Sequence, residues 1–398
     1  MKKAYIHIGH EKTGTSAVQI FLQKNAAVLQ EHNFVYLGDD SRPYVHGIGH
    51  FPIVGSFYES CPNFIPLRKH KPSGYVLNAL YKDVQNTDHD IILSCEHFAS
   101  RLDKRENIEA LKNALSGRDI KIICYLRRQD DQALSLYSTL VKGGATFPFS
   151  ISNISPKNRY FNYYTILRDW AAVFGDENII IREYARANLV NQDVCADFLN
   201  VLGVEMVKFE SVGEKNVSLD ALQIGILRQL NRHLTSYPWG GTNIDLTEFE
   251  RSQNIRVALT PHLSAGSPIQ TLMKKSDRVE ILSILKESNF KAADAFDAAN
   301  FILDWHHSEN IYEQGDDKLN ACQITLDDFG QSLVSCGQML HEQQNIINHQ
   351  KALLVQRDQE KCKALKERDH ALRLLKDAQK PLFSRLLKSI KKQLTSAD

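Results

Sequence analysis

Near its N-terminus the chain carries the sequence AYIHIGHEKTGTSAVQIF, which passes from an apolar run through a loop with two glycines into an amphipathic pattern. The run Ala4–Ile8 predicts a buried strand, and the apolar residues after the loop predict a helix that begins at Thr15 or Ser16. Backbone amides at the first turn of a helix have no internal partner and carry partial positive charge, so this junction favours an anion. Lys12 adds a full charge, and the hydroxyls of Thr13, Thr15 and Ser16 add donors. The stretch therefore predicts a phosphate-binding loop.

The order of residues in this loop argues against an ordinary ATPase or GTPase. A Walker A motif has its lysine after the second glycine, whereas Lys12 precedes Gly14 in the string KTGTS. A solvated turn between a strand and a helix in an unrelated α/β domain remains the alternative on this motif alone.

A second anion-binding element is predicted after the apolar run at 120–126, which ends in Arg127 and Arg128. An arginine at the carboxyl end of a strand can hold a phosphate with its planar guanidinium group. Ser135 lies eight residues after Arg127, two turns into the next predicted helix, and reaches the same anion if that helix folds back across the strand end. A solvated pair of arginines is the alternative.

The two motifs together, KTGTS at 12–16 and YLRRQDDQALS at 125–135, resemble the sulfotransferases that use 3′-phosphoadenosine-5′-phosphosulfate (PAPS). The resemblance spans roughly residues 4–220 and is strongest to the bacterial, carbohydrate-type branch. It implies that the loop binds the 5′-phosphosulfate and that the strand end binds the 3′-phosphate. The donor site so implied consists of Lys12, Thr13, Gly14, Thr15, Ser16, Arg127 and Ser135.

One departure from that family lies in the loop itself, where His10 and Glu11 stand before the lysine in place of the proline that is often found there. A carboxylate beside a dianionic donor is unfavourable. We therefore expect Glu11 to point away from the donor or to pair with Lys12.

The candidates for the catalytic base follow the apolar strand predicted at 90–94, which runs directly into Cys95-Glu96-His97. In doubly wound sheets the ligand lies beyond the carboxyl ends of the strands, so Glu96 and His97 would face the crevice that Lys12 faces. Either side chain can accept a proton from an acceptor hydroxyl. The alternative is a helix-capping carboxylate beside a structural histidine.

The order of elements predicts an α/β fold with a doubly wound, mostly parallel sheet of the P-loop or sulfotransferase type and a helical cap, over residues 1–315. Residues 316–380 predict a coiled-coil extension, because Leu326 starts an apolar heptad repeat. We expect self-association through 326–378. The tail at 381–398 predicts a basic amphipathic helix that contacts an anionic membrane surface through 382–394, or else packs on the protein itself.

The composition indicates in which cellular compartment the protein works and which partners it binds. The net charge of +1 gives no electrostatic argument for nucleic acid. The seven cysteines include no CxxC pair, which favours free thiols over a zinc site or a disulfide framework. No signal peptide or transmembrane run is found, so we expect a cytoplasmic protein with possible peripheral attachment to the inner membrane surface.

The resemblance implies transfer of a sulfuryl group from PAPS to a hydroxyl of a carbohydrate or glycan. Lys12 would stabilise the charge that develops in the transition state, Glu96 or His97 would accept the proton, and no metal is expected. Two other hypotheses remain: a kinase-like phosphotransferase, and a non-catalytic nucleotide-binding scaffold that carries the coiled coil.

Overall fold

The computed structural model describes residues 2–213, 219–235, 246–263 and 266–307, and toward the C-terminus residues 346, 348–357, 359–360, 363 and 367–368. The chain divides into two compact units, Met1–Leu326 and Asp327–Asp398. All labelled strands and helices belong to the first unit.

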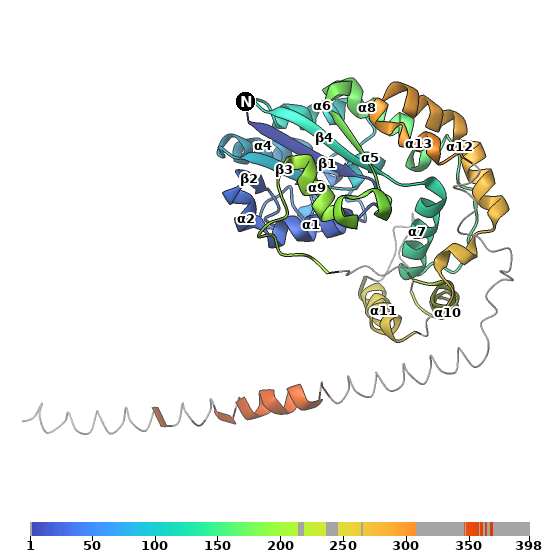
Figure 1. Ribbon diagram of the computed structural model, residues 1–398. Coiled ribbons are helices and arrows are strands. Elements are labelled where there is room, and N and C mark those ends of the chain that lie inside the picture. The colour runs from blue at the N-terminus through green and yellow to red at the C-terminus, as the bar shows by residue number, and fades with distance from the viewer. Residues whose placement is uncertain are drawn as a thin grey trace, which may run out of the picture. The chain divides into compact units, whose positions relative to one another are not determined.

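The first unit is built on one sheet of five strands in the order β2-β3-β1-β4-β5 (Figure 1). Every pairing is parallel, and His7 of β1 lies opposite Ser94 of β3. The strands are β1 Lys3–Gly9, β2 Phe34–Tyr36, β3 Asp90–Ser94, β4 Asp119–Leu126 and β5 Ile179–Glu183. The predicted α/β class with a parallel sheet is confirmed.

Helices cover both faces of the sheet because its central strands are apolar on both sides. Ala4, Ile6 and Ile8 of β1 belong to one buried cluster, and Tyr5 belongs to another on the opposite face. The first face packs against α3 Phe51–Gly55, α4 Ser73–Gln85, α5 His97–Arg101, α6 Arg105–Ala114 and α8 Tyr163–Phe174. The second face packs against α1 Thr15–Lys24, α2 Ala26–Glu31 and α9 Val194–Leu202, so the sheet is doubly wound (Figure 1).

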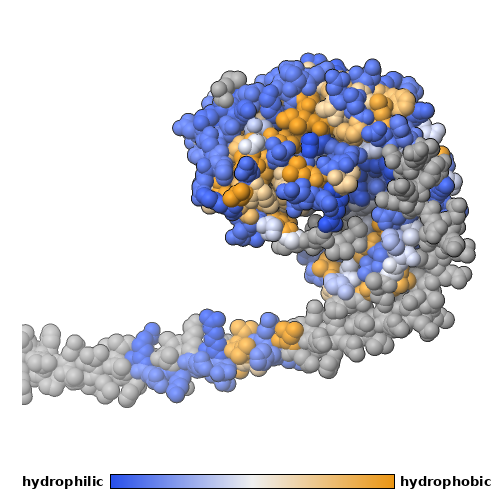
Figure 2. Space-filling model, in the orientation of Figure 1, coloured by the Kyte–Doolittle hydropathy of each residue, from blue (hydrophilic) through white to orange (hydrophobic). Residues whose placement is uncertain are grey.

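The remaining helices form a cap beside the carboxyl ends of the strands. The cap contains α7 Gln129–Lys142, α10 Ala221–Asn231, α11 Leu246–Leu259 and α12 Lys275–Ala295, and α13 Phe301–Asp304 follows (Figure 1). Apolar residues of α7, α10 and α12 share a third buried cluster of their own. On the face seen in Figure 2, hydrophilic residues dominate the rim of this unit and hydrophobic residues gather nearer its middle.

One strand of the sheet is not predicted from the sequence. Strand β2, Phe34–Tyr36, follows Asn33, whose φ of 66° turns the chain into the strand. Three residues are too few to show an alternating pattern, so the sequence does not distinguish this segment from a loop. In the structure it pairs with β3 at the edge of the sheet.

Most of the predicted C-terminal features lie outside the described residues. Residues 348–357 are helical, and Leu353 and Leu354 are more than half exposed there. The start of the heptad repeat at Leu326 and the basic tail at 382–394 lie outside the described residues, so self-association and membrane contact stay predictions. Among the residues that are described, no helix has the length and apolar character needed to cross a bilayer.

A buried carboxylate joins the last strands to α9. Asp197 is fully buried and accepts hydrogen bonds from the Tyr125 hydroxyl at 2.8 Å and from Arg182 at 3.0 and 2.5 Å. The Val190 amide completes the set at 3.1 Å. Burial opposes ionisation of this carboxyl, but the hydrogen bonds from Arg182, Tyr125 and Val190 prevail, and the pKa of Asp197 is lowered.

We expect Asp197→Ala to lower the free energy of unfolding by about 3 kcal/mol, because it removes a fully buried carboxylate and leaves the partly buried Arg182 and the buried Tyr125 hydroxyl without their acceptor. Asp176→Ala is the matched control, since Asp176 also accepts two hydrogen bonds from one arginine, Arg168, but is exposed. That variant should lose less than about 1 kcal/mol. Urea denaturation measures both, and equal losses would contradict the prediction.

The pH dependence of stability gives a second measurement on Asp197. Because its folded pKa is depressed, its contribution is present above the unfolded value of about 3.9 and is lost as the pH falls through that value toward the folded pKa. The stability difference between wild type and Asp197→Asn should therefore shrink below about pH 4.

Candidate functional site

In the loop between β1 and α1, residues 10–14, a backbone carbonyl accepts hydrogen bonds from two nearby threonine hydroxyls. The His10 carbonyl accepts hydrogen bonds from the Thr13 hydroxyl at 2.6 Å and from the Thr15 hydroxyl at 3.3 Å. Two of the hydroxyls offered by the sequence thus donate within the loop in this structure, while Ser16 is exposed at the first turn of α1. Both threonines stabilise the turn.

The next two carbonyls of the loop accept hydrogen bonds from side chains that follow strand β4. The Glu11 carbonyl accepts from the Gln132 side-chain amide at 2.6 Å, and the Lys12 carbonyl accepts from the Arg127 guanidinium at 3.2 Å. In a trans peptide the C=O of one residue and the N–H of the next point in opposite directions. The amides that follow His10, Glu11 and Lys12 therefore point away from these donors.

Two glycines are needed because the loop is crowded and its backbone is left-handed. Gly9 has a φ of 70°, and a Cβ there would lie 2.8 Å from the Cα of Glu96. Gly14 has a φ of 80°, and its Cβ would lie 3.0 Å from both Tyr184 and Val194. The loop is therefore enclosed between the carboxyl end of β3 and the segment that joins β5 to α9.

Arg127 reaches the loop from the carboxyl end of β4. Besides its bond to the Lys12 carbonyl, its guanidinium lies 5.7 Å from the centre of the Tyr184 ring. Its own carbonyl accepts a hydrogen bond from the Tyr163 hydroxyl at 2.5 Å. The Arg127 side chain thus contacts the loop at the backbone of Lys12, which is 115 residues away in the sequence.

Both positive and negative side chains lie close enough to Lys12 to act on its charge. Burial is the largest effect that lowers the pKa of the Lys12 ammonium, and the positive charges of Lys142 and Arg127 lower it further. Glu96 and Glu11 oppose this. Lys142, at the last turn of α7, is a cation that sequence reasoning missed, because only the fold brings the end of that helix near the loop.

Ser135 lies on α7 three residues after Gln132, which contacts the loop through the Glu11 carbonyl. Residues three apart share one face of a helix, so Ser135 lies on the face that Gln132 turns toward the loop. It is partly exposed, and its own carbonyl accepts a hydrogen bond from Thr139 at 3.2 Å.

Glu96 lies against Gly9, directly after the carboxyl end of β3. Its Oε2 accepts a hydrogen bond from the Gln19 side-chain amide at 3.3 Å. Burial raises the pKa of the Glu96 carboxyl, and the charge of Glu11 adds to that effect. The nearby His97 and the Gln19 amide act in the opposite direction.

Glu11 pairs with a histidine and not with Lys12. Its Oε1 lies 3.1 Å from Nδ1 of His97 and accepts a hydrogen bond from the Ser100 hydroxyl at 2.5 Å. Burial opposes ionisation of Glu11, yet the hydrogen bond from His97 and the neighbouring His10 outweigh it and lower the pKa of Glu11. The acidic residue of the loop is thus directed toward α5.

Other histidines near the site are structural. Burial lowers the pKa of His7 to about 3, and His7 bonds to the Ser94 hydroxyl at 2.9 Å. Burial also lowers the pKa of His50 to about 4, and both of its ring nitrogens lie 3.0 Å from backbone carbonyls, those of Ser94 and Leu37. His10 is fully buried, and burial lowers its pKa as well.

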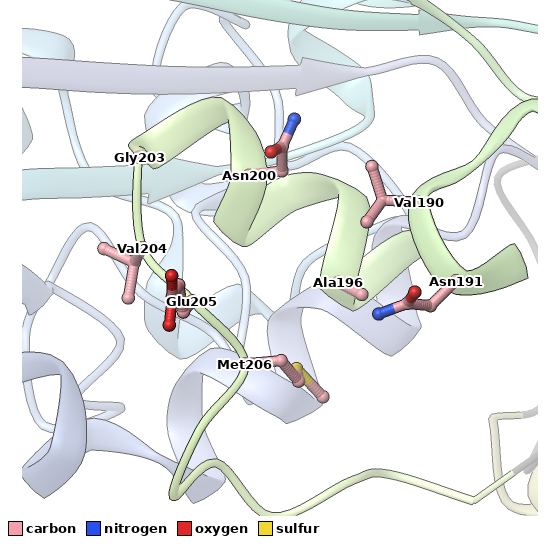
Figure 3. Close-up of a pocket in the computed structure, with 8 residues that line it drawn as sticks. All are labelled: Val190, Asn191, Ala196, Asn200, Gly203, Val204, Glu205 and Met206. Atoms are coloured by element: carbon pink, nitrogen blue, oxygen red, sulfur yellow. The ribbon is translucent and has the colours of Figure 1, made fainter.

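A pocket of about 420 Å³ lies elsewhere, along α9 and the segments on either side of it (Figure 3). None of the predicted site residues lines it. Its lining consists of Val190, Asn191, Ala196, Asn200, Gly203, Val204, Glu205 and Met206. Within the described part of the chain, no three or more His, Cys, Asp or Glu side chains are grouped as metal ligands.

No family model matches the sequence. An uncharacterized protein of Archaeoglobus fulgidus is 34% identical over 181 residues, which are 44% of this chain and 46% of that protein, so the chain spans about half the length of this curated relative. The crystal structure of a sulfotransferase from Alicyclobacillus acidocaldarius aligns with a TM-score of 0.37 and 15% identity, over 55% of this chain and 87% of that one.

We expect Gly14→Ala to destabilise the protein more than Gly117→Ala. Both residues have a left-handed backbone, with φ of 80° and 86°, but a Cβ at Gly117 would meet nothing within 4 Å. Gly117→Ala should therefore cost only the left-handed strain, about 1–2 kcal/mol. Gly14→Ala adds the clash with Tyr184 and Val194, about 1 kcal/mol or more. Thermal and urea denaturation measure the difference, and equal losses would show that the loop is not tightly enclosed.

Proposed function

We propose that the chain is a sulfotransferase that moves the sulfuryl group of PAPS to a hydroxyl of a carbohydrate or glycan. The observation that carries the proposal is the contact between Arg127 and the Lys12 carbonyl. It joins two cationic motifs, each at the carboxyl end of its own strand, around one loop. A donor with an anionic group at each end matches such a pair of sites.

The residues present fit that donor. Gly9 and Gly14 both have a positive φ, which lets the loop turn tightly before α1, so that the backbone amides at the start of this helix can face an anion. We assign the 5′-phosphosulfate to this loop and the 3′-phosphate to the strand-β4 end. The assigned contacts are Lys12, Thr13, Gly14, Thr15 and Ser16 for the first group, and Arg127 and Ser135 for the second.

When bound, PAPS supplies an activated sulfuryl group on a good leaving group. The chain's own part is electrostatic and positional. Lys12 is held in a largely buried place, where its charge stabilises an anion more strongly than it would in water. Glu96 or His97, at the carboxyl end of the neighbouring strand, accepts the proton of the attacking hydroxyl.

Thermal-shift titration separates this proposal from the alternatives. Only a ligand that binds the folded state raises the melting temperature by mass action. We expect stabilisation by 3′-phosphoadenosine 5′-phosphate and little by ATP with magnesium. The reverse result would favour a phosphotransferase, and binding without transfer to any acceptor in a carbohydrate panel would favour a scaffold.

Single variants of the two cationic residues should have different effects on nucleotide affinity. Lys12→Ala should weaken 3′-phosphoadenosine 5′-phosphate and its 3′-dephospho form alike, by about 1.5–3 kcal/mol. Arg127→Ala should weaken only the 3′-phosphorylated form and so erase the preference between the two. Arg168→Ala, at an exposed ion pair on α8, is the control. Calorimetry that finds the preference intact in Arg127→Ala would refute the assignment.

The catalytic base is tested by Glu96→Gln and His97→Ala. The variant that removes the base should lose most of its turnover while its affinity for the donor stays close to wild type, because the group acts only in the transition state. Initial rates with labelled PAPS, together with calorimetry, separate the two effects. Full activity in both variants would place the base elsewhere.

A further inference from the structure

The imidazole of His97 is held on several sides. Its Nδ1 lies 3.1 Å from Oε1 of Glu11. The rings of Phe51 and Phe64 meet it edge to face, with centroids 5.2 and 4.7 Å away. Phe64 in turn lies under the guanidinium of Arg101, 5.1 Å from its ring centre. The ring therefore has little freedom to turn, and its side chain is only 14% exposed.

The partner at Nδ1 determines the position of the proton on this ring. An ionised carboxylate only accepts hydrogen bonds, so Nδ1 must carry the hydrogen in the contact with Glu11. In the neutral imidazole the lone pair then lies on Nε2, which is the arrangement that a general base needs. The Ser100 hydroxyl donates to the same carboxylate oxygen and holds Glu11 in place from α5.

We propose that Glu11 is a positioning residue that fixes the tautomer and orientation of His97, so that Nε2 of His97, and not the carboxylate of Glu96, takes the proton of the acceptor hydroxyl. The inference rests on the proposed sulfuryl transfer and names the base that this transfer uses. It also gives a role to the acidic residue that stands at this place in the loop.

The step balances without a further reactant. The acceptor oxygen forms a bond to sulfur, and the bond between sulfur and the bridging phosphate oxygen breaks. The hydroxyl proton moves to Nε2 of His97, and 3′-phosphoadenosine 5′-phosphate leaves with the electron pair. Glu11 stays ionised and stabilises the imidazolium that forms.

Glu96 is less suited to this task. It is packed against Gly9, and its Oε2 is engaged by the Gln19 amide at 3.3 Å. It also lies close enough to Glu11 and His97 for their charges to act on it.

The experiment compares Glu11→Gln, Glu11→Asp and Ser100→Ala with the wild-type chain. Histidine labelled with ¹⁵N reports which ring nitrogen is protonated, and the His97→Ala spectrum identifies the His97 signals. Turnover with labelled PAPS and calorimetry with 3′-phosphoadenosine 5′-phosphate are measured on the same samples. The NMR arm uses the nucleotide-free protein and so does not depend on activity.

We expect wild type to carry its hydrogen on Nδ1 of His97. Glu11→Gln can donate from its amide to Nδ1, so it should shift the hydrogen toward Nε2 and lower kcat about 10- to 100-fold, with nucleotide affinity changed less than threefold. Glu11→Asp keeps a carboxylate that accepts a hydrogen bond. It should therefore keep part of the hydrogen on Nδ1 of His97 and part of the wild-type kcat. Ser100→Ala removes the other hydrogen bond to Oε1 and should leave the tautomer unchanged.

The outcomes distinguish the inference from the function on which it rests. If wild type transfers sulfuryl groups but Glu11→Gln changes neither the tautomer nor kcat, the positioning role is overturned and the function stands. If Glu96→Gln abolishes turnover and His97→Ala does not, the base is Glu96. In that case the positioning role of Glu11 is also overturned, and the proposed function stands. If wild type neither binds the nucleotide nor transfers, the proposed function itself is wrong.

Discussion

The site depends on how the β1–α1 loop satisfies its own carbonyl groups. Three successive carbonyls, those of His10, Glu11 and Lys12, accept hydrogen bonds from side chains of the protein. Since each peptide plane directs its N–H opposite to its C=O, these bonds also orient the following amides. The donors come from the loop itself, from α7 and from the end of β4. The same bonds that stabilise the loop therefore join it to Arg127.

A buried ion cluster determines which of the two adjacent arginines reaches the loop. Asp130 is fully buried and accepts hydrogen bonds from Arg128 at 2.8 and 3.0 Å and from Arg278 of α12 at 2.5 Å. Burial opposes its ionisation, but the charges of Arg128 and Arg278 lower the pKa of Asp130. Arg128 is thereby directed toward the cap, while Arg127 bonds to the Lys12 carbonyl. The sequence alone left a solvated arginine pair open, and these contacts argue against it.

Local patterns predicted most of the sheet because its strands are continuous apolar runs. Strand β3 is expected at 90–94 and is observed at Asp90–Ser94, and the helix expected to begin at Thr15 or Ser16 begins at Thr15. Contacts between segments that are far apart in the sequence are harder to predict. Glu11 and His97 are 86 residues apart, and no pattern within either segment specifies the other. The internal use of the Thr13 hydroxyl also depends on the left-handed turn at Lys12, which a β-strand or helix period does not reveal.

The register of two neighbouring strands explains why the loop and the candidate base meet. His7 of β1 lies opposite Ser94, the last residue of β3, and β1 ends two residues later at Gly9. Glu11 follows His7 by four residues and His97 follows Ser94 by three, and the two side chains meet beyond the strand ends. A carboxylate in the loop is normally unfavourable beside an anionic donor. Here the Glu11 carboxylate is paired with His97 and accepts a hydrogen bond from the Ser100 hydroxyl, so under the proposal the loop assigned to the donor also carries the residue that orients the base.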